Sequence, residues 1–69
     1  MEIILNNNPD FIETSKKSIT VAELLALKNF SYKLLVVKVN NTLVRKDQYS
    51  SATVKDGDNV QVIHLITGG

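Results

Sequence analysis

The residues able to take part in covalent chemistry are few in this 69-residue chain. It has no cysteine and one histidine, His64, so its side chains offer no thiolate nucleophile, no cysteine-based zinc site and no complete catalytic triad. We expect His64 to have a structural or surface role. Asp56 and Asp58 stand on either side of Gly57, a pattern more typical of a tight turn than of acid–base chemistry or metal binding. The side chains therefore predict a protein that holds no metal and is not an autonomous enzyme.

The remaining candidate is the carboxylate of Gly69, which follows Gly68 at the end of the sequence. A carboxylate is a poor electrophile, so joining it to an amine or to sulfide requires activation, typically as an acyl-adenylate made with ATP. Because glycine lacks a Cβ and adopts unusual backbone angles, two terminal glycines could thread a narrow cleft of an activating enzyme. A frayed tail would be the alternative reading of the same pair.

Composition and charge restrict the class of protein further. A chain of this length with 43% hydrophobic residues predicts one domain, residues 1–69, ending in a flexible Gly-Gly tail. The net charge of +1 and the scattered lysines argue against nucleic acid, and no apolar run is long enough for a membrane span. No targeting signal follows Met1, so a cytoplasmic location is expected. The charged groups expected to be solvated are Asp10, Glu13, Lys16-Lys17 and Arg45-Lys46.

The clearest local pattern predicts a helix that begins after Thr20. Thr20 and Glu23 have the T-x-x-E spacing of a capping box, and Ile19 and Leu24 occupy the two positions of a hydrophobic staple. Asn29 is suited to end the helix. The residues expected to form one buried stripe are Val21, Leu24 and Leu25, with Leu27 alongside.

Strand-like segments surround this helix and are separated by turn formers. The predicted strands are Ile3–Leu5, Phe11–Thr14, Tyr32–Val39, Thr42–Arg45 and Val60–Ile66. The predicted turns are Asn6–Asp10, Asn40-Asn41 and Lys55–Asp58, and Lys46–Ser51 is expected to be a loop or a single helical turn. A sheet crossed by one helix is the simplest way to bury all the apolar faces. The order predicts an α+β β-grasp (ubiquitin-like) fold, a mixed five-stranded sheet packed on one α-helix, with the first and last strands parallel and central.

Alternation along the last predicted strand divides its apolar side chains between two faces. Val60 and Val62 are expected to face the helix, and Ile63 and Leu65 the other side. Since one helix can cover only one face, we expect Ile63 and Leu65 to form an exposed patch where a partner enzyme docks. In the alternative, the loop around Tyr49 covers them.

Four segments taken together, "ITVAELL", "VKVNNTLVRKDQY", "KDGDNVQVI" and the terminal "GG", resemble the ThiS sulfur-carrier family of thiamine biosynthesis. The resemblance covers nearly the entire chain from Ile19, with a looser match in the first hairpin. The chain departs from the family at Asn40-Asn41, where Asn-Gly is frequent, and at Thr67, where a third glycine or an alanine is frequent.

The resemblance implies a role for the terminal glycines. Gly69 would be adenylated by a ThiF-type adenylating enzyme, which uses ATP, and converted to a thiocarboxylate with sulfur from a cysteine desulfurase. A ThiG-type thiazole synthase would then use that sulfur, with Gly68 as the flexible neighbour of the reacting residue. The chain itself would bind no cofactor.

Other functions fit part of the same pattern. The MoaD family, the small subunit of molybdopterin synthase, has a similar fold and tail but tends to be longer, and a carrier for tRNA thiolation would also end in this way. A protein-modifying tag would form amides with lysines of its targets, whereas a binding module of the TGS type would not use the tail. Mass spectrometry separates these classes, because only a carrier exchanges a carboxyl oxygen for sulfur.

Overall fold

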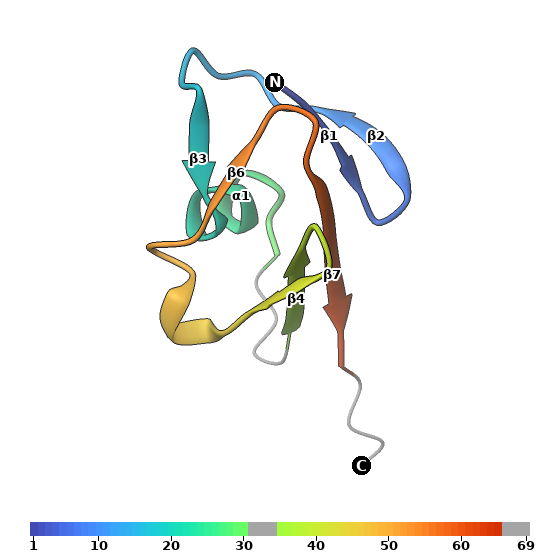
Figure 1. The fold of residues 1–69 in the computed structure, drawn as a ribbon, viewed down its shortest axis with the longest axis vertical. Helices are drawn as coiled ribbons and strands as arrows, with labels where there is room; N and C mark the ends of the chain where they lie inside the picture. Colours follow the sequence, from blue (N-terminus) through green and yellow to red (C-terminus); the bar gives the residue numbers. More distant parts are fainter. Residues whose placement is uncertain (31–34, 66–69) are drawn as a thin grey trace.

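The computed structural model describes residues 1–30 and 35–65, and the parts of the predictions that fall on 31–34 and 66–69 lie outside the described residues. The described chain forms two sheets, one α-helix and one 3₁₀ turn (Figure 1). In chain order the elements are β1 (Glu2–Leu5), β2 (Asn8–Phe11), β3 (Ser18–Thr20), α1 (Val21–Leu27), β4 (Leu35–Val39), β5 (Thr42–Val44), the 3₁₀ turn η1 (Lys46–Gln48), β6 (Thr53–Lys55) and β7 (Asn59–His64).

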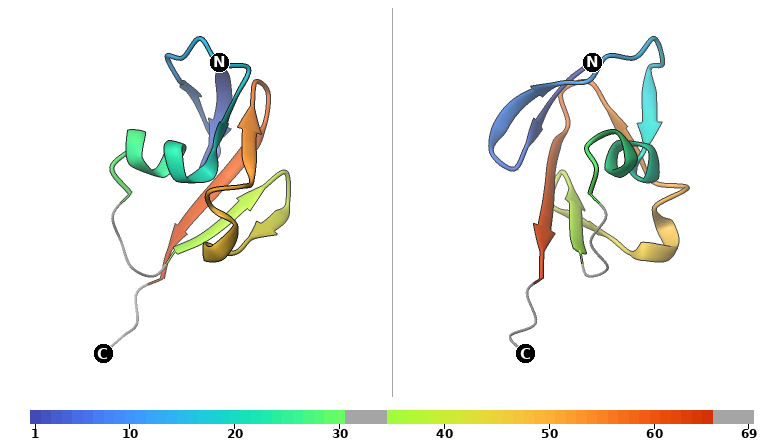
Figure 2. Two further views of the ribbon diagram at one scale, coloured as in Figure 1. Left: turned by 90° about the vertical axis from the view of Figure 1, so that its left-hand side faces the viewer. Right: turned by 180° about the vertical axis from the view of Figure 1, so that it is seen from behind.

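The larger sheet has five strands in the order β2-β1-β7-β4-β5. β1 and β7 pair in parallel, and the other neighbours pair antiparallel. The first and last strands therefore lie side by side in the interior of the sheet, as predicted, with β7 at its centre. The helix α1 lies against one face of this sheet (Figure 2). This confirms the predicted α+β β-grasp arrangement of a mixed five-stranded sheet and one helix.

The core is formed by the buried side chains of α1 and by the strand side chains that point towards the helix. Its buried hydrophobic residues are Ile3, Leu5, Ile12, Ile19, Val21, Leu24, Leu25, Val37, Val44, Val54, Val60 and Val62. The prediction that Leu27 lies alongside the buried stripe is wrong, because its side chain is exposed. At 3.6 residues per turn, Leu27 points about 110° away from the centre of the stripe formed by the three buried residues of α1. No described helix has the length and apolar character needed to cross a membrane.

Side chains and backbone close both ends of α1 as the sequence predicts. The Thr20 hydroxyl accepts a hydrogen bond from the Glu23 amide at 3.0 Å, and the Glu23 carboxylate accepts one from the Thr20 amide at 3.0 Å. At the other end Asn29 has a φ of 59°, and the Phe30 amide donates to the Leu25 carbonyl at 2.9 Å. This is the Schellman ending, which a residue with positive φ allows.

The first hairpin differs from the prediction. The turn consists of Asn6 and Asn7 alone, both with positive φ (51° and 69°), so β2 already begins at Asn8. The bounds predicted for the second strand, Phe11–Thr14, are wrong. Because the turn has only two residues, Asn8–Phe11 pairs with β1 instead. Pro9 therefore lies within a strand, which is possible because β2 is at the edge of the sheet.

A second sheet, formed by β3 and β6, was not predicted. It pairs Ile19 with Val54, and both side chains are buried. The Val21 amide continues the pairing by donating to the Ala52 carbonyl at 2.9 Å. Each strand has three residues, too few for a periodic pattern, and the partners are far apart in sequence. Only the tertiary fold brings them together.

The remaining turns follow the sequence closely. Asn40 and Asn41 have φ of 50° and 68° and join β4 to β5, and Gly57 has a φ of 87° in the turn before β7. The strand predicted over Thr42–Arg45 ends one residue earlier, at Val44. The last strand, predicted over Val60–Ile66, spans Asn59–His64. The segment predicted as a loop or single helical turn contains η1.

Candidate functional site

The predicted carrier residues, Gly68 and Gly69, lie outside the described residues, which end at Leu65. The site can therefore be built up to the strand that precedes them. β7 runs through the middle of the sheet and points away from the end of the molecule where the amino terminus lies (Figure 1). We therefore describe the geometry and the exposure of β7, the last described strand before the terminal residues in the sequence.

The side chains of β7 alternate between the core and the outside. Val60 and Val62 are 0% and 6% exposed and face α1, whereas Ile63 and Leu65, the residue directly after the strand ends at His64, are 45% and 46% exposed. The expected exposure of Ile63 and Leu65 is confirmed, and the alternative that the loop around Tyr49 covers them is wrong, because Tyr49 packs against the core instead. A role of these two residues in docking stays a prediction.

Neighbouring strands extend this exposed surface. Ile63 lies opposite Val36 of β4, and Lys38 of β4 lies between Gln61 of β7 and Leu43 of β5. Residues opposite each other in a sheet share a face, so all of these side chains lie on the face away from α1. We call Leu43 of β5, Ile63 of β7 and Leu65, which follows β7, the outer patch, because they are exposed large apolar residues of this face.

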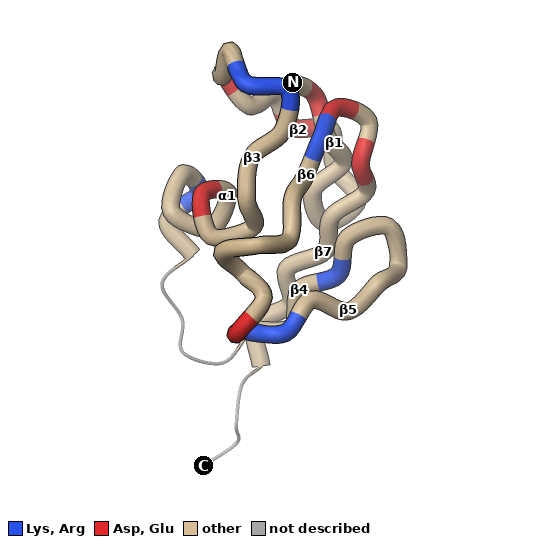
Figure 3. The backbone as a smooth tube through the Cα atoms, turned by 60° about the vertical axis from the view of Figure 1, so that its left-hand side comes forward, with Lys and Arg blue, Asp and Glu red and all other residues tan. Residues whose placement is uncertain are grey.

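The sequence reasoning missed Leu43 and Lys38 as members of this surface. Alternation along Thr42–Val44 could have placed Leu43 on the outward face if Val44 had been assigned to the core. That assignment requires knowing which face of β5 is turned to the core. Basic segments lie close to the outer patch. Figure 3 shows one on β4 and another directly after β5, where Arg45 and Lys46 are exposed. The patch thus combines apolar side chains with a basic flank.

The carboxylates around Gly57 serve the turn, as predicted. Asp58 is buried, and its carboxylate accepts hydrogen bonds from the Lys55 amide at 2.9 Å and from Asn40 Nδ2 at 3.0 Å. Asp56 Oδ1 accepts from the Glu2 amide at 2.7 Å. Within residues 1–30 and 35–65, no group of three or more His, Cys, Asp or Glu side chains is arranged to hold a metal ion. His64 is exposed at the end of β7, which fits a surface role.

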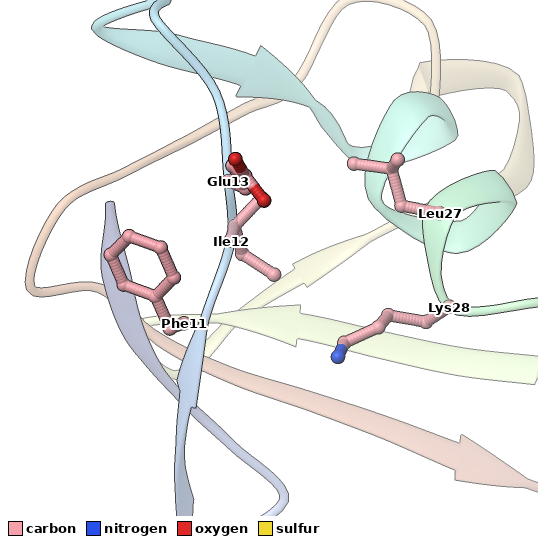
Figure 4. Close-up of a pocket in the computed structure, with 5 residues that line it drawn as sticks. All are labelled: Phe11, Ile12, Glu13, Leu27 and Lys28. Atoms are coloured by element: carbon pink, nitrogen blue, oxygen red, sulfur yellow. The ribbon is translucent and has the colours of Figure 1, made fainter.

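An open pocket of about 180 Å³ lies between the end of β2 and the end of α1 (Figure 4). Its lining residues are Phe11, Ile12, Glu13, Leu27 and Lys28. The Lys28 ammonium is 2.7 Å from the Asp10 carboxylate, and both side chains are about 30% exposed. The expectation that Asp10 belongs to a solvated edge holds in part, because Asp10 lies on the edge strand β2 but is only partly exposed and is paired with Lys28. Neither residue of the predicted docking pair lines this pocket.

A contact explains one of the two basic pairs noted in the sequence, Lys16-Lys17, in part. Lys16 Nζ lies 2.8 Å from Glu23 Oε2, so one lysine of the first pair braces the start of α1 on the surface. Lys17, Arg45 and Lys46 are exposed, as is Glu13, in agreement with the expected solvated charges.

Comparison with known proteins gives one consistent result. The sequence model of the ThiS family matches residues 3–69. The sulfur carrier protein ThiS of Bacillus subtilis (strain 168) is 26% identical over 66 residues, covering 96% of this chain and 100% of that protein.

Solved structures agree with the family match. A crystal structure of the thiamine biosynthesis protein ThiS from Geobacter metallireducens is 31% identical, with a TM-score of 0.83 over 100% of both chains. A solution structure of a thiamine biosynthesis protein from the same organism is 31% identical, with a TM-score of 0.77 over 100% of this chain and 88% of that one. The chain therefore belongs to the ThiS family, the sulfur carrier proteins of thiamine biosynthesis, and is a carrier rather than a catalyst.

Proposed function

We propose that this chain carries sulfur as a thiocarboxylate on Gly69 and donates it for thiazole formation in thiamine biosynthesis. The observation that carries the proposal is the ThiS-family match over residues 3–69, which includes both terminal glycines. The chemistry of the chain supports it, since the sequence has no cysteine and the acidic side chains beside Gly57 are committed to backbone and Asn40 contacts.

The proposed reaction proceeds in two steps on partner enzymes. A carboxylate oxygen of Gly69 attacks the α-phosphorus of ATP on a ThiF-type adenylating enzyme, and pyrophosphate leaves. Sulfide, released from the persulfide of a cysteine desulfurase by a thiol that is oxidised to a disulfide in the exchange, then attacks the acyl carbon of the adenylate, and AMP leaves with the bonding electron pair. The product is the thiocarboxylate, which a ThiG-type thiazole synthase uses as its sulfur donor. This chain contributes the reacting carboxylate and a fold that presents it, and it needs no bound cofactor.

The outer patch is the proposed docking surface for these enzymes. Ile63 and Leu65 remain exposed although apolar, and Leu43 adds a third apolar side chain to the same face. Exposed apolar side chains next to charged ones are typical of the centre and rim of a protein interface. Leu65 precedes Gly69 by four residues in the sequence, so a partner docked on the patch would need only a short segment of chain to reach the terminal glycine.

The test compares the natural chain, a chain lacking Gly69 and a chain with one alanine added after Gly69. Removing one residue shortens the reach of an extended segment by about 3.3–3.6 Å, and a misplacement near 1 Å can cost about a hundredfold in rate. We expect ATP–pyrophosphate exchange with a ThiF-type enzyme, and sulfur gain by intact mass, for the natural chain alone. Equal circular-dichroism spectra of the three chains would show that folding is unchanged.

Several outcomes would contradict the proposal. Equal exchange by all three chains, or a natural chain that never gains sulfur while the enzyme activates its own carrier, would favour a binding module. High-mass conjugates to lysines would indicate a protein-modifying tag. A thiocarboxylate that supports molybdopterin synthase or tRNA thiolation, but not thiazole formation, would keep the carrier and change the pathway.

A further inference from the structure

The two edges of β7 are supported to different extents. On one edge, β4 pairs with β7 at five positions, from Val39 opposite Val60 to Leu35 opposite His64. On the other edge, β1 pairs with β7 at two positions only, the last being Leu5 opposite Val60. Among the described residues, no strand continues this second edge beyond Val60. The half of β7 that leads to the outer patch therefore relies on something other than a neighbouring strand on that side.

The side chain of Asn6 takes the place of the missing strand. The Asn6 amide donates to the Val60 carbonyl at 2.9 Å, and Asn6 Oδ1 accepts from the Val62 amide at 2.8 Å. The second bond is partly buried and joins residues 56 positions apart. Asn6 has a φ of 51°, so the backbone leaves β1 in the hairpin turn while the side chain extends the pairing of β7 by one more step.

Asn40 makes comparable hydrogen bonds at the beginning of the same strand. We call such a pair of bonds, one from the backbone and one from the side chain of an asparagine to β7, a clasp. Its Oδ1 accepts from the Asn59 amide at 2.9 Å, its amide donates to the Asn59 carbonyl at 2.7 Å, and its Nδ2 donates to Asp58. Its φ is also positive, at 50°. The β1–β2 and β4–β5 turns that carry the two asparagines lie on opposite sides of β7 (Figures 1 and 2). The two clasps differ in that only Asn6 holds β7 at Val62, next to the outer patch.

We propose that Asn6 is a positioning residue for the carrier function, acting through Val62 on the course of β7 and hence on Ile63 and Leu65, which precede the terminal glycines in the sequence. This inference rests on the proposed function. A strand paired on one edge only can pivot about that edge, and displacements near 1 Å at a reacting group can cost about a hundredfold in rate. Loss of the acceptor would also leave the partly buried Val62 amide without its partner, which favours local opening of the strand.

The experiment uses substitutions that separate the side-chain acceptor from the backbone angle. Asn6→Gly removes Oδ1 and retains access to positive φ, whereas Asn6→Asp keeps an acceptor oxygen and tolerates the same φ. Asn40→Gly is the matched control, because it removes the side-chain contact to Asn59 at the start of β7 and leaves the contact to Val62 in place. Asn7→Gly is the control for the turn itself, since Asn7 has a φ of 69° and is exposed.

Three experiments are made on the full chain: thermal unfolding, ATP–pyrophosphate exchange with a ThiF-type enzyme for kcat and KM, and hydrogen exchange of the Val62 amide. The kinetic measurements are made at a temperature where every variant is folded. We expect Asn6→Gly to lower kcat by about tenfold or more, because the carboxylate is misplaced in the bound complex. It should also accelerate exchange of the Val62 amide, and Asn6→Asp should restore both values.

The controls decide between positioning and general stability. Asn40→Gly should lower thermal stability and leave kcat close to that of the natural chain, and Asn7→Gly should change neither. Natural kcat in Asn6→Gly, or an equal loss of kcat in Asn40→Gly, would overturn the inference. A natural chain that is never activated would overturn the proposed function and this inference with it, whereas an activated natural chain with a fully active Asn6→Gly variant overturns this inference alone.

Discussion

Both faces of β7 carry apolar side chains, yet the burial of these side chains differs strongly between the two faces. Val60 and Val62 are almost fully buried under α1, whereas Ile63 and Leu65 are each about half exposed. The difference arises because side chains alternate along a strand and the domain has one α-helix among its described elements, which covers one face of the sheet. A single strand thus serves the fold with one face and leaves the other face available to partners.

The energetic consequence of this division is large. Fully burying a valine or leucine side chain contributes about 1.5–3 kcal/mol, whereas a half-exposed side chain contributes only part of that amount. A domain of this size has a total stability of only about 5–15 kcal/mol or less. The inward face should therefore govern folding, and the outward face should govern binding with little effect on folding. The predictions below test this separation, from the largest expected effect on stability to the smallest.

The largest effect should come from removing the helix side chain packed over the inward face. Leu24 is 0% exposed, so Leu24→Ala should lower the free energy of unfolding by about 2–5 kcal/mol through lost burial and a residual cavity. Urea unfolding followed by circular dichroism measures this loss. A change below about 1 kcal/mol would show that the inward face is not the core that holds the fold.

A smaller effect should come from loosening the start of the helix while leaving its buried face intact. Thr20→Ala removes the hydroxyl that accepts from the Glu23 amide and should cost about 1 kcal/mol. The same unfolding assay applies, with Thr20→Ser as the control that retains the hydroxyl. If the loss equalled that of Leu24→Ala, Thr20 would have a role in the core beyond capping.

The carboxylate of Glu23 in the capping box should make part of the free energy of unfolding depend on pH. The hydrogen bond from Lys16, followed by the bond from the Thr20 amide, lowers the pKa of Glu23 from 4.5 to about 2. A carboxyl whose pKa is lowered on folding stabilises the native state above its ordinary pKa, and this contribution is lost as the pH falls from 4.5 towards 2. Unfolding curves at several pH values should show the advantage of the natural chain over Glu23→Gln shrinking in that window. An advantage independent of pH would contradict the assignment.

The smallest effect on stability should come from the outward face, with the greatest effect on function. Ile63→Asp replaces a side chain that is 45% exposed and should lower the free energy of unfolding by less than about 1 kcal/mol, because only about half of the side chain is buried. The same substitution should abolish ATP–pyrophosphate exchange with a ThiF-type enzyme, because a charge is placed in the proposed docking surface.

Leu27→Asp is the matched control for this experiment. Leu27 is an exposed leucine on α1 beside the pocket of Figure 4, which no residue of the outer patch lines. Its substitution should leave exchange unchanged. Unfolding of Ile63→Asp would place Ile63 in the core, and equal loss of exchange in both variants would remove the special role of the outer patch.

The sequence by itself determined the features that depend on neighbouring residues. The capping box needs only Thr20 and Glu23, three positions apart, and the hairpin turn at Asn40-Asn41 needs only two residues that tolerate positive φ. The division of β7 into a buried and an exposed face follows from alternation once one helix is expected. These local patterns, combined in order, were enough to predict the β-grasp fold.

Only the tertiary structure decided the features that join distant segments. The sheet of β3 and β6, the Asp10–Lys28 ion pair, and the bond from the Val62 amide to Asn6 each connect residues many positions apart. Such contacts leave no periodic signal, because each partner alone resembles an ordinary polar or short apolar segment. Placing Leu43 on the same face as Ile63 required the strand register for the same reason, since register depends on pairing across the sheet and not on the order of residues within a strand.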